Sequence, residues 1–333
     1  MILHPAVLAL LIGSLLTSCM LFYALCYGIQ IVAKWDIKSG SEQQLILERR
    51  TYLITTILRN TLVFQLFSLF LFIYTADSLH SLFTGAMCAA GTLNVNPFGY
   101  PLLIMKIVNF MLAGLWLIIN HADTMGYDYP LIKFKYALLI AIAPLVFLET
   151  FFLFEYFAGL HADVITSCCG SLFSLDRPGI SGDLAALPSR PMEIAFYAGM
   201  AATACSGLYF YRKGRGGYLF SSVSFLTFII AVASLISFIC LYFYELPTHH
   251  CPFCILQKEY GYVGYALYIF LLGGGVAGMG TGALQPFRKL GSMICLIPAL
   301  QKRLTALNLI LYLLFTLTVT YRLLFSSLWL CGN

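Results

Sequence analysis

Apolar residues dominate this chain in long runs, and polar residues collect between the runs. Each run is about 20 residues long, which is the length that an α-helix needs to cross the hydrocarbon core of a bilayer. The pattern therefore predicts an all-α fold, a polytopic membrane helix bundle with about eight transmembrane helices. The predicted spans are 6–33, 53–75, 101–121, 134–157, 191–211, 218–243, 255–280 and 305–328.

Composition supports a membrane protein. Of the 333 residues, 60% are apolar and only 10% are charged, and the mean hydropathy is +0.87. A soluble domain carries about a quarter charged residues because its surface faces water, so this composition argues against that class. The net charge of +5 does not indicate nucleic-acid binding. The basic residues stand in short clusters beside apolar runs, where they report topology.

Most basic loop residues fall in every second loop between the predicted spans, and the alternate loops hold only Arg177 and Arg190 as loop cations. Four loops hold Lys34, Lys38, Arg49 and Arg50; Lys133 and Lys135; Arg212, Lys213 and Arg215; and Arg288, Lys289, Lys302 and Arg303. Because positively charged loops stay in the cytoplasm, the pattern predicts that both termini are non-cytoplasmic.

This topology separates the eleven cysteines into two groups. Four lie within predicted spans, where cysteine commonly acts as a small apolar residue, and Cys295 lies in a cytoplasmic loop. The other six are expected outside the cytoplasm, where disulfides are stable, so they suggest redox chemistry or loops held by disulfides. These six are Cys88, Cys168, Cys169, Cys251, Cys254 and Cys331.

The segment between the sixth and seventh spans carries the most specific chemistry. It contains two histidines, His249 and His250, followed by Cys251-Pro252-Phe253-Cys254. Proline suits a first helical turn, so we expect the seventh helix to begin here with Cys251 near its N-cap. The helix dipole there favours a thiolate, as would protonated histidines. Such a pair can close and reopen a disulfide through a mixed-disulfide intermediate.

This segment resembles the active-site region of the DsbB family of membrane disulfide oxidases, with vitamin K epoxide reductases as more distant relatives. The resemblance covers the motif, and the topology extends it to spans five through eight. It implies that Cys254 lies next to a quinone, ubiquinone or menaquinone, and that Cys251 exchanges with a second thiol pair. Lys258 matches the family's basic position beside the quinone, where arginine is usual. Four residues separate Lys258 from Cys254, so on a helix they share a face.

The second thiol pair of the family is incomplete in this sequence. The family has two cysteines in the outer loop after the helix that follows the motif helix, and only Cys331 stands there. A complete relay must therefore use Cys88, Cys168 or Cys169, or a soluble thioredoxin-like partner. Adjacent cysteines form only a strained disulfide, so Cys168 and Cys169 are expected to have separate partners or to bind a metal. A disulfide that fixes the loop to the bundle is an equally simple role.

The two halves of the chain run in parallel. The first half has Cys88 between its second and third spans and ends with Cys168 and Cys169, and the second half has Cys251 and Cys254 at the equivalent place and ends with Cys331. This suggests two four-helix membrane units, 1–157 and 191–333, joined by a cysteine-containing outer loop, 158–190. The relation would be a parallel repeat, with Lys106 as the counterpart of Lys258, although four-helix units with outer cysteines also arise independently.

Other polar residues inside predicted spans have two interpretations each. Glu149 and Glu155 could transfer protons to or from a quinone, or could form structural ion pairs with Lys106 or Arg59. Gly274, Gly278 and Gly282 repeat at four-residue spacing, which favours close helix packing.

The function predicted from these observations is thiol–disulfide exchange coupled to a membrane quinone, in a bacterial inner membrane with the motif on the periplasmic face. We expect no bound metal in this interpretation and no nucleic-acid partner. Two alternatives stay open. Cysteines and histidines could handle copper, zinc or mercury, or the chain could be a structural subunit of a larger membrane complex. Haem is disfavoured because all six histidines lie near span ends.

Overall fold

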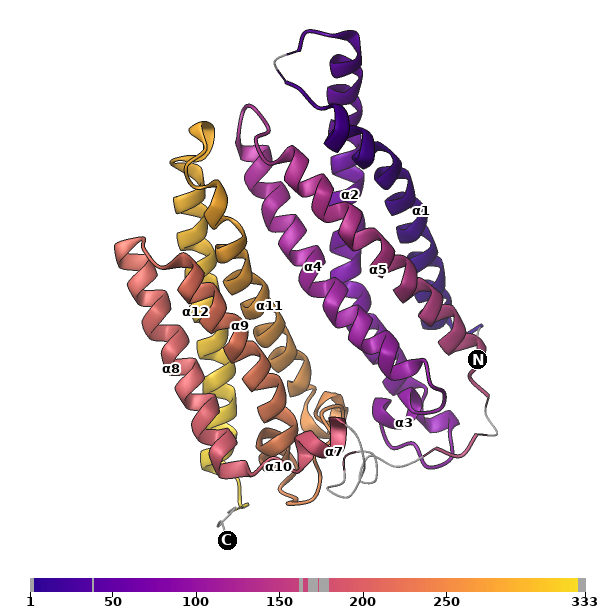
Figure 1. Cartoon of the computed structure of the whole chain (residues 1–333). Helices are drawn as coiled ribbons and strands as arrows, with labels where there is room; N and C mark the ends of the chain where they lie inside the picture. The colour runs from indigo at the N-terminus through magenta and orange to yellow at the C-terminus, as the bar shows by residue number, and fades with distance from the viewer. Residues whose placement is uncertain (1–2, 38, 162–163, 167–172, 174–179, 329–333) are drawn as a thin grey trace. The chain divides into compact units, whose positions relative to one another are not determined.

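The computed structural model contains α-helices joined by short turns and no β-strand in the part of the chain that it describes (Figure 1). The described residues are 3–37, 39–161, 164–166, 173 and 180–328. Long helices are expected because a backbone in lipid must satisfy its own hydrogen bonds. The α-helices are α1 (Pro5–Lys34), α2 (Glu42–Ser78), α3 (Ala89–Leu93), α4 (Gly99–Met125), α5 (Ile132–Ala158), α7 (Ile180–Ala185), α8 (Ser189–Lys213), α9 (Gly217–Ser234), α10 (Cys240–Tyr244), α11 (Val263–Ala283) and α12 (Leu296–Phe325).

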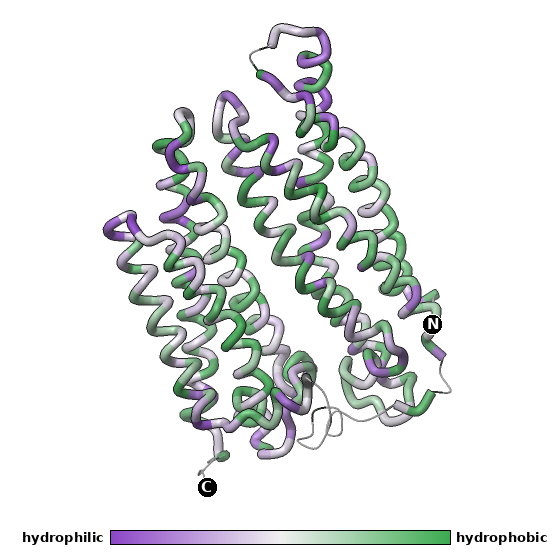
Figure 2. The backbone as a smooth tube through the Cα atoms, in the orientation of Figure 1, coloured by the Kyte–Doolittle hydropathy of each residue, from purple (hydrophilic) through white to green (hydrophobic). Residues whose placement is uncertain are grey.

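Seven segments of the described chain are long and apolar enough to cross a membrane. They contain α1, α2, α4, α5, α9 with α10, α11 and α12. The remaining predicted span, 191–211, corresponds to α8, a 25-residue helix that is long enough but less apolar. Apolar residues follow the helices, and hydrophilic residues gather toward their ends (Figure 2). The predicted all-α membrane bundle is thus confirmed.

The structure divides into two compact units. Unit 1 comprises residues 1–75, 96–161 and 283–300, and unit 2 comprises residues 76–95, 162–282 and 301–333. These bounds differ from the predicted division at 157 and 191. In particular, the segment 76–95, which carries Cys88, belongs to unit 2 with the CPFC motif rather than to the unit formed by the first helices.

Unit 1 is built from α1, α2, α4 and α5, and α5 packs against both α1 and α4. Its apolar core includes the fully buried Trp116 and Tyr136. The Trp116 indole N–H donates to the carbonyl of Lys135 over 2.9 Å. Lys135 was expected in a basic loop. It lies instead buried in α5, where its Nζ is 2.6 Å from Asp123.

Unit 2 contains α8, α9, α10 and α11 and most of α12. Close packing of α11 against its neighbours depends on glycine. A Cβ added at Gly278 would lie 2.1 Å from the Ser224 hydroxyl of α9, and one at Gly274 would lie 2.3 Å from the Tyr312 ring of α12. A Cβ at Gly282 would meet Ser221. The predicted packing role of this glycine stripe is confirmed.

Candidate active site

The segment that carries the CPFC motif is a chain of tight turns rather than the start of a helix. After α10 ends, Glu245 adopts a left-handed conformation with φ 55°. Two 3-10 turns follow, Cys254–Leu256 and Lys258–Tyr260, and α11 begins only at Val263. The predicted span 255–280 therefore starts eight residues too early. The expected position of Cys251 at a helix N-cap, with its dipole effect on the thiol, is wrong.

The expected helical relation between Cys254 and Lys258 is also wrong. Gln257 lies between the two 3-10 turns in an extended conformation, with ψ 162°, so no continuous helix connects them. Cys254 is buried, whereas Lys258 is exposed. The interruption is at Gln257 itself, and Gly261, with a φ of 62°, ends the second turn before α11 begins.

Three cysteines gather in unit 2. The sulfur atoms of Cys88, Cys251 and Cys254 all lie within 4.8 Å of one another. The Cys88 and Cys251 sulfurs are 3.6 Å apart, at hydrogen-bonding distance and longer than the about 2.05 Å of a disulfide bond. Both side chains are fully buried, and Cys254 is 6% exposed. Of the cysteines proposed for a relay, the structure thus brings Cys88 to the motif.

Two tyrosines fix the backbone of the motif. The Tyr244 hydroxyl, at the end of α10, donates to the carbonyl of Cys251 over 2.5 Å and accepts the backbone N–H of Ile255 over 2.9 Å. The Tyr268 hydroxyl, on α11, donates to the carbonyl of Pro252. These bonds satisfy backbone groups that no helix satisfies here, because unpaired buried backbone groups are costly. The loop between α10 and α11 is consequently held from both helices.

The position of Cys88 is fixed by a separate set of contacts. The Gln257 side chain donates to the carbonyl of Met87 over 2.8 Å and to the Asp77 carboxylate over 3.3 Å. The same carboxylate oxygen accepts the backbone N–H of Ala89 over 3.1 Å. Gln257 and Asp77 therefore clamp the two residues that flank Cys88 onto the motif segment.

The segment around Cys88 is also tied to the chain that follows α5. The backbone N–H of Thr166 donates to Thr84 over 3.0 Å, and its hydroxyl donates to Gly91 over 2.9 Å. Gly85 allows this approach, since its φ is 89° and a Cβ there would lie 2.2 Å from the Thr166 carbonyl oxygen. Thr166 precedes the predicted relay cysteines Cys168 and Cys169, which lie outside the described residues, as does Cys331.

The two histidines of the motif have different surroundings. His249 Nε2 is 3.4 Å from the Cys254 sulfur, and its ring packs edge-on against Tyr244 at 4.6 Å between centroids. His250 is buried and its Nδ1 donates to the carbonyl of Ile236 over 2.8 Å. His249 thus contacts the thiol of Cys254, on which the sequence predicted an influence. His250 anchors the loop to the π-helical turn Leu235–Ile239.

The two predicted proton-transfer residues lie in unit 1, and they differ. Glu149 is buried and forms an ion pair of 2.8 Å with Lys106. Its carboxylate also accepts from Gln65 and from Asn109, the latter over 2.6 Å. Glu155 is exposed. The structural ion pair with Lys106 that the sequence suggested is present, and proton transfer by either glutamate stays a prediction.

Sequence reasoning missed the residues that hold the cluster together, namely Asp77, Tyr244, Gln257 and Tyr268. Asp77 carried a usable signal, because a carboxylate near the end of an apolar span is costly without partners. Tyr244 and Tyr268 carried none, since tyrosine is common at membrane interfaces. Gln257 was overlooked because its neighbour Lys258 matched the basic position of the family resemblance at helical spacing from Cys254.

Compared with protein-family models, curated proteins and solved structures, the chain matches none.

Proposed function

We propose that this chain is a membrane thiol–disulfide oxidoreductase. A disulfide is exchanged among Cys88, Cys251 and Cys254, and a membrane quinone accepts or donates the electrons. The supporting observation is the cluster itself, three sulfur atoms within 4.8 Å of one another. Cys88 is 163 residues away from Cys251 in the sequence. Local chain geometry therefore does not explain their proximity, which supports a role that requires the sulfur atoms to be together.

The exchange step conserves atoms and charge. With a disulfide between Cys251 and Cys254, attack by the Cys88 thiolate on the Cys251 sulfur forms the Cys88–Cys251 bond and breaks the Cys251–Cys254 bond. The two sulfurs that bond start 3.6 Å apart and must approach to about 2.05 Å. The leaving Cys254 thiolate receives a proton, and His249, 3.4 Å away, is placed to supply it.

The electron-transfer step involves two electrons and two protons. Oxidation of the Cys251 and Cys254 thiols to one disulfide releases two electrons and two protons. Reduction of a quinone to a quinol consumes two electrons and two protons. Aromatic side chains beside Cys254 support a flat ligand, since Tyr244 contacts both His249 and Tyr260, the latter at 4.9 Å between centroids. Lys258 is the residue that the family resemblance puts beside such a ring.

Burial favours Cys88 over a soluble protein as the first exchange partner of Cys251. Thiol–disulfide exchange requires access of the attacking sulfur to the sulfur attacked. Cys251 and Cys88 are both 0% exposed, and they already touch. A thioredoxin-like protein would therefore act later in the relay, through a more accessible cysteine. The proposed location is a bacterial inner membrane with this cluster at the periplasmic face.

Trapping of thiols with a mass-tag alkylating agent tests the proposal. In isolated membranes, the three cysteines should change together between thiol and disulfide when an oxidised or reduced quinone analogue is added. Cys88→Ser should abolish the Cys88–Cys251 species and leave a Cys251–Cys254 disulfide. Cys205→Ser is the control, since Cys205 lies in α8 of unit 2 and is not part of the cluster. A pair that stays oxidised under every condition would contradict the proposal.

A soft metal ion is the second candidate, favoured by the same three sulfurs. At a metal–sulfur distance of about 2.3 Å, sulfurs around one ion lie about 4 Å apart, within the range seen here. Thiolates select ions such as Cu(I). The alkylation experiment separates the two functions. Metal protection would be removed by a chelator and would not respond to a quinone, whereas a redox pair would respond to the quinone and ignore the chelator.

A further inference from the structure

The three sulfur atoms of the cluster can pair in more than one way. Cys88, Cys251 and Cys254 all lie within 4.8 Å of one another, so distance alone lets Cys88 attack either sulfur of a Cys251–Cys254 disulfide. Attack on Cys251 forms the Cys88–Cys251 bond and expels Cys254. Attack on Cys254 forms the Cys88–Cys254 bond and expels Cys251. Each exchange replaces one thiolate with another, so the product depends on which sulfur leaves more readily.

His249 lies beside one of the two sulfurs that can leave. Its Nε2 is 3.4 Å from the sulfur of Cys254, whereas the sulfur of Cys251 lies 3.6 Å from that of Cys88, the attacking group. His249 is also partly exposed, so it can exchange protons with solvent. A hydrogen bond or a proton stabilises a leaving thiolate. This contact therefore favours the departure of Cys254 and bond formation at Cys251.

Tyr244 keeps the imidazole in this position. The two rings meet edge to face at 4.6 Å between centroids, and Tyr244 is only 7% exposed. The turn that precedes His249 is exposed, and a bond of 3.4 Å from the His249 N–H to the carbonyl of Leu246 closes it. The Tyr244 ring is fixed by its own hydroxyl, which is bonded to the motif backbone on both sides of Cys254. It is therefore the rigid surface against which the imidazole packs.

We infer that His249 and Tyr244 decide which disulfide the cluster forms. His249 is the catalytic residue, which gives a proton to Cys254 as the Cys251–Cys254 bond breaks and the Cys88–Cys251 bond forms. Tyr244 is the positioning residue that keeps the imidazole at Cys254. The step is balanced, because Cys88 gives up one proton on becoming a thiolate and Cys254 gains one. The inference rests on the proposed function, since it concerns the direction of the same exchange.

This choice of product has a consequence for the rest of the relay. With Cys88 bonded to Cys251, the free thiol is that of Cys254, the least buried of the three at 6% exposed. The opposite choice would leave Cys251 free, and Cys251 is fully buried. The selected product thus leaves the free thiol beside a partly exposed histidine, where a quinone or a second thiol has the shortest way to it.

The ratio of two disulfides tests the inference. The full chain, reduced and purified in detergent, is treated with substoichiometric diamide, and alkylated samples taken over time are analysed by peptide mass spectrometry. The wild type should form mainly the Cys88–Cys251 disulfide and little Cys88–Cys254 disulfide. His249→Ala should lower this ratio about tenfold or more, because a hydrogen bond to a charged group is lost.

Two substitutions at Tyr244 separate its ring from its hydroxyl. Tyr244→Leu removes both and should lower the ratio as His249→Ala does. Tyr244→Phe removes the hydroxyl and keeps the ring, so it should slow the exchange and keep the ratio close to that of the wild type. The double variant Tyr244→Leu/His249→Ala should have no lower ratio than either single variant, because the two residues act as one unit. A purely structural role of Tyr244 predicts the same ratio in the Phe and Leu variants.

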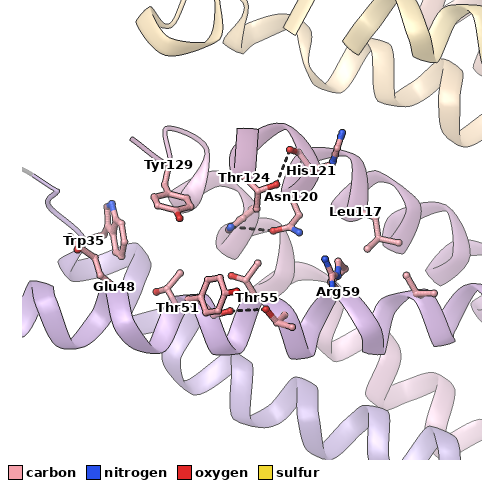
Figure 3. Close-up of a pocket in the computed structure, with 14 residues that line it drawn as sticks. Trp35, Glu48, Thr51, Thr55, Arg59, Leu117, Asn120, His121, Thr124 and Tyr129 are labelled. Atoms are coloured by element: carbon pink, nitrogen blue, oxygen red, sulfur yellow. Dashed lines mark hydrogen bonds between the residues drawn. The ribbon is translucent and has the colours of Figure 1, made fainter. Parts of the chain in front are cut away.

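Two controls test that the effect is local. Tyr242→Leu makes the same replacement elsewhere on α10, at a ring that packs on Phe238 at 6.4 Å between centroids. His121→Ala removes a histidine of α4 that lines a polar cavity of about 730 Å³ in unit 1 (Figure 3). The lining of this cavity contains no cysteine among the described residues. Both variants should keep the wild-type ratio.

The possible failures can be told apart. An unchanged ratio in His249→Ala would overturn the inference and leave the proposed function in place. This variant decides the matter even where Tyr244→Leu fails to fold, because His249 is partly exposed. Equal shifts in Tyr244→Phe and Tyr244→Leu would overturn the positioning role of the ring. A wild type that forms no disulfide among the three cysteines would contradict the proposed function itself, and the inference with it.

Discussion

The two units of this protein bury polar groups in different ways. Among the described residues, all four buried charged side chains lie in unit 1, as the pairs Lys106–Glu149 and Lys135–Asp123. In the described part of unit 2 the buried polar groups are uncharged hydroxyls, amides and thiols, and the buried His250. An example is Asn308, which donates to the Ser224 hydroxyl over 2.9 Å and to the Gly274 carbonyl over 2.7 Å.

This difference indicates which unit can accommodate a redox reaction. A buried ion pair cannot change the charge of one partner without leaving the other uncompensated, which is strongly unfavourable. A buried dithiol can become a disulfide while remaining neutral, because two protons leave with the two electrons. Unit 1 is therefore suited to holding a fixed arrangement of helices, and unit 2 can accommodate a redox change at Cys88, Cys251 and Cys254.

Breaking the buried ion pair should have the largest effect. Glu149→Ala leaves the Lys106 ammonium buried beside Gln65, Ser68 and Asn109 without its counter-charge, so we expect a loss of about 3–5 kcal/mol in the free energy of unfolding. The measurement is reversible unfolding in mixed detergent micelles. Glu155→Ala, an exposed glutamate on the same helix, is the control and should cost little.

The double variant Lys106→Met/Glu149→Leu sharpens this test. Replacing both charges with apolar groups of similar size should restore much of the lost stability. If the single variant Glu149→Ala were as stable as the wild type, the fixed-charge description of unit 1 would be wrong.

Disturbing the close helix packing of unit 2 should have the next largest effect. Gly278→Ala places a Cβ against the Ser224 side chain and 2.9 Å from the Asn308 amide, neither of which is a flexible chain end. We expect a loss of about 1–3 kcal/mol in unfolding free energy, the usual cost of overpacking. Gly273→Ala is the control, since its Cβ would meet only the end of Leu311, at 3.1 Å. Equal losses in both variants would contradict the packing role.

Removing the Gln257 clamp should have a smaller effect on stability and a specific effect on the cysteines. Gln257→Ala removes the hydrogen bonds to Met87 and Asp77, each worth about 1 kcal/mol. Because these bonds position Cys88, oxidation of purified protein with a mild oxidant should form the Cys88–Cys251 disulfide more slowly. Gln44→Ala, which removes a buried hydrogen-bonding glutamine from unit 1, should leave that rate unchanged.

The smallest expected effect concerns pH at the end of unit 2. Hydrogen bonds from Ser327 lower the pKa of Glu245 below its ordinary value of 4.5, with Arg322 contributing. A carboxylate with a lowered pKa stabilises the folded state above its ordinary pKa, and the contribution is lost as the pH falls through the lowered value. The contact should thus be present at pH 7 and lost in strong acid.

Hydrogen exchange at the Ser327 amide, corrected for the intrinsic rate, can follow this contact. Glu245→Gln should exchange faster than the wild type at pH 7, and the difference should disappear only in strong acid, once the pH has fallen through the lowered pKa of the carboxylate. Glu259→Gln, an exposed glutamate in the turn Lys258–Tyr260, should show no difference at any pH. A difference that persists in acid would mean that the charge of Glu245 is not involved.

The amino-acid sequence was enough to predict that this is a helical membrane protein and that its most specific chemistry lies in the CPFC segment. Lipid offers no partner for an open backbone, so an apolar run of bilayer length is expected to be helical, and the spanning helices could be predicted from these runs, although the start of α11 could not. The four-residue spacing of Gly274, Gly278 and Gly282 indicated a packing face, because residues at this spacing lie on one side of a helix. The ion pair between Lys106 and Glu149 was foreseeable as one of two roles, because buried charges require partners.

The meeting of the cysteines depends on the fold of distant segments and could not be predicted from sequence. The spacing of Cys254 and Lys258 suggested one helix face, but the loop conformation depends on Tyr244, Gln257 and Tyr268, whose hydrogen bonds reach residues distant in the chain. The proximity of Cys88 to Cys251 arises in the same way, from contacts between segments that share no periodicity. Helices in a membrane are fixed by local backbone requirements. The shape of the turns that join them depends on side chains of residues that are distant in the sequence.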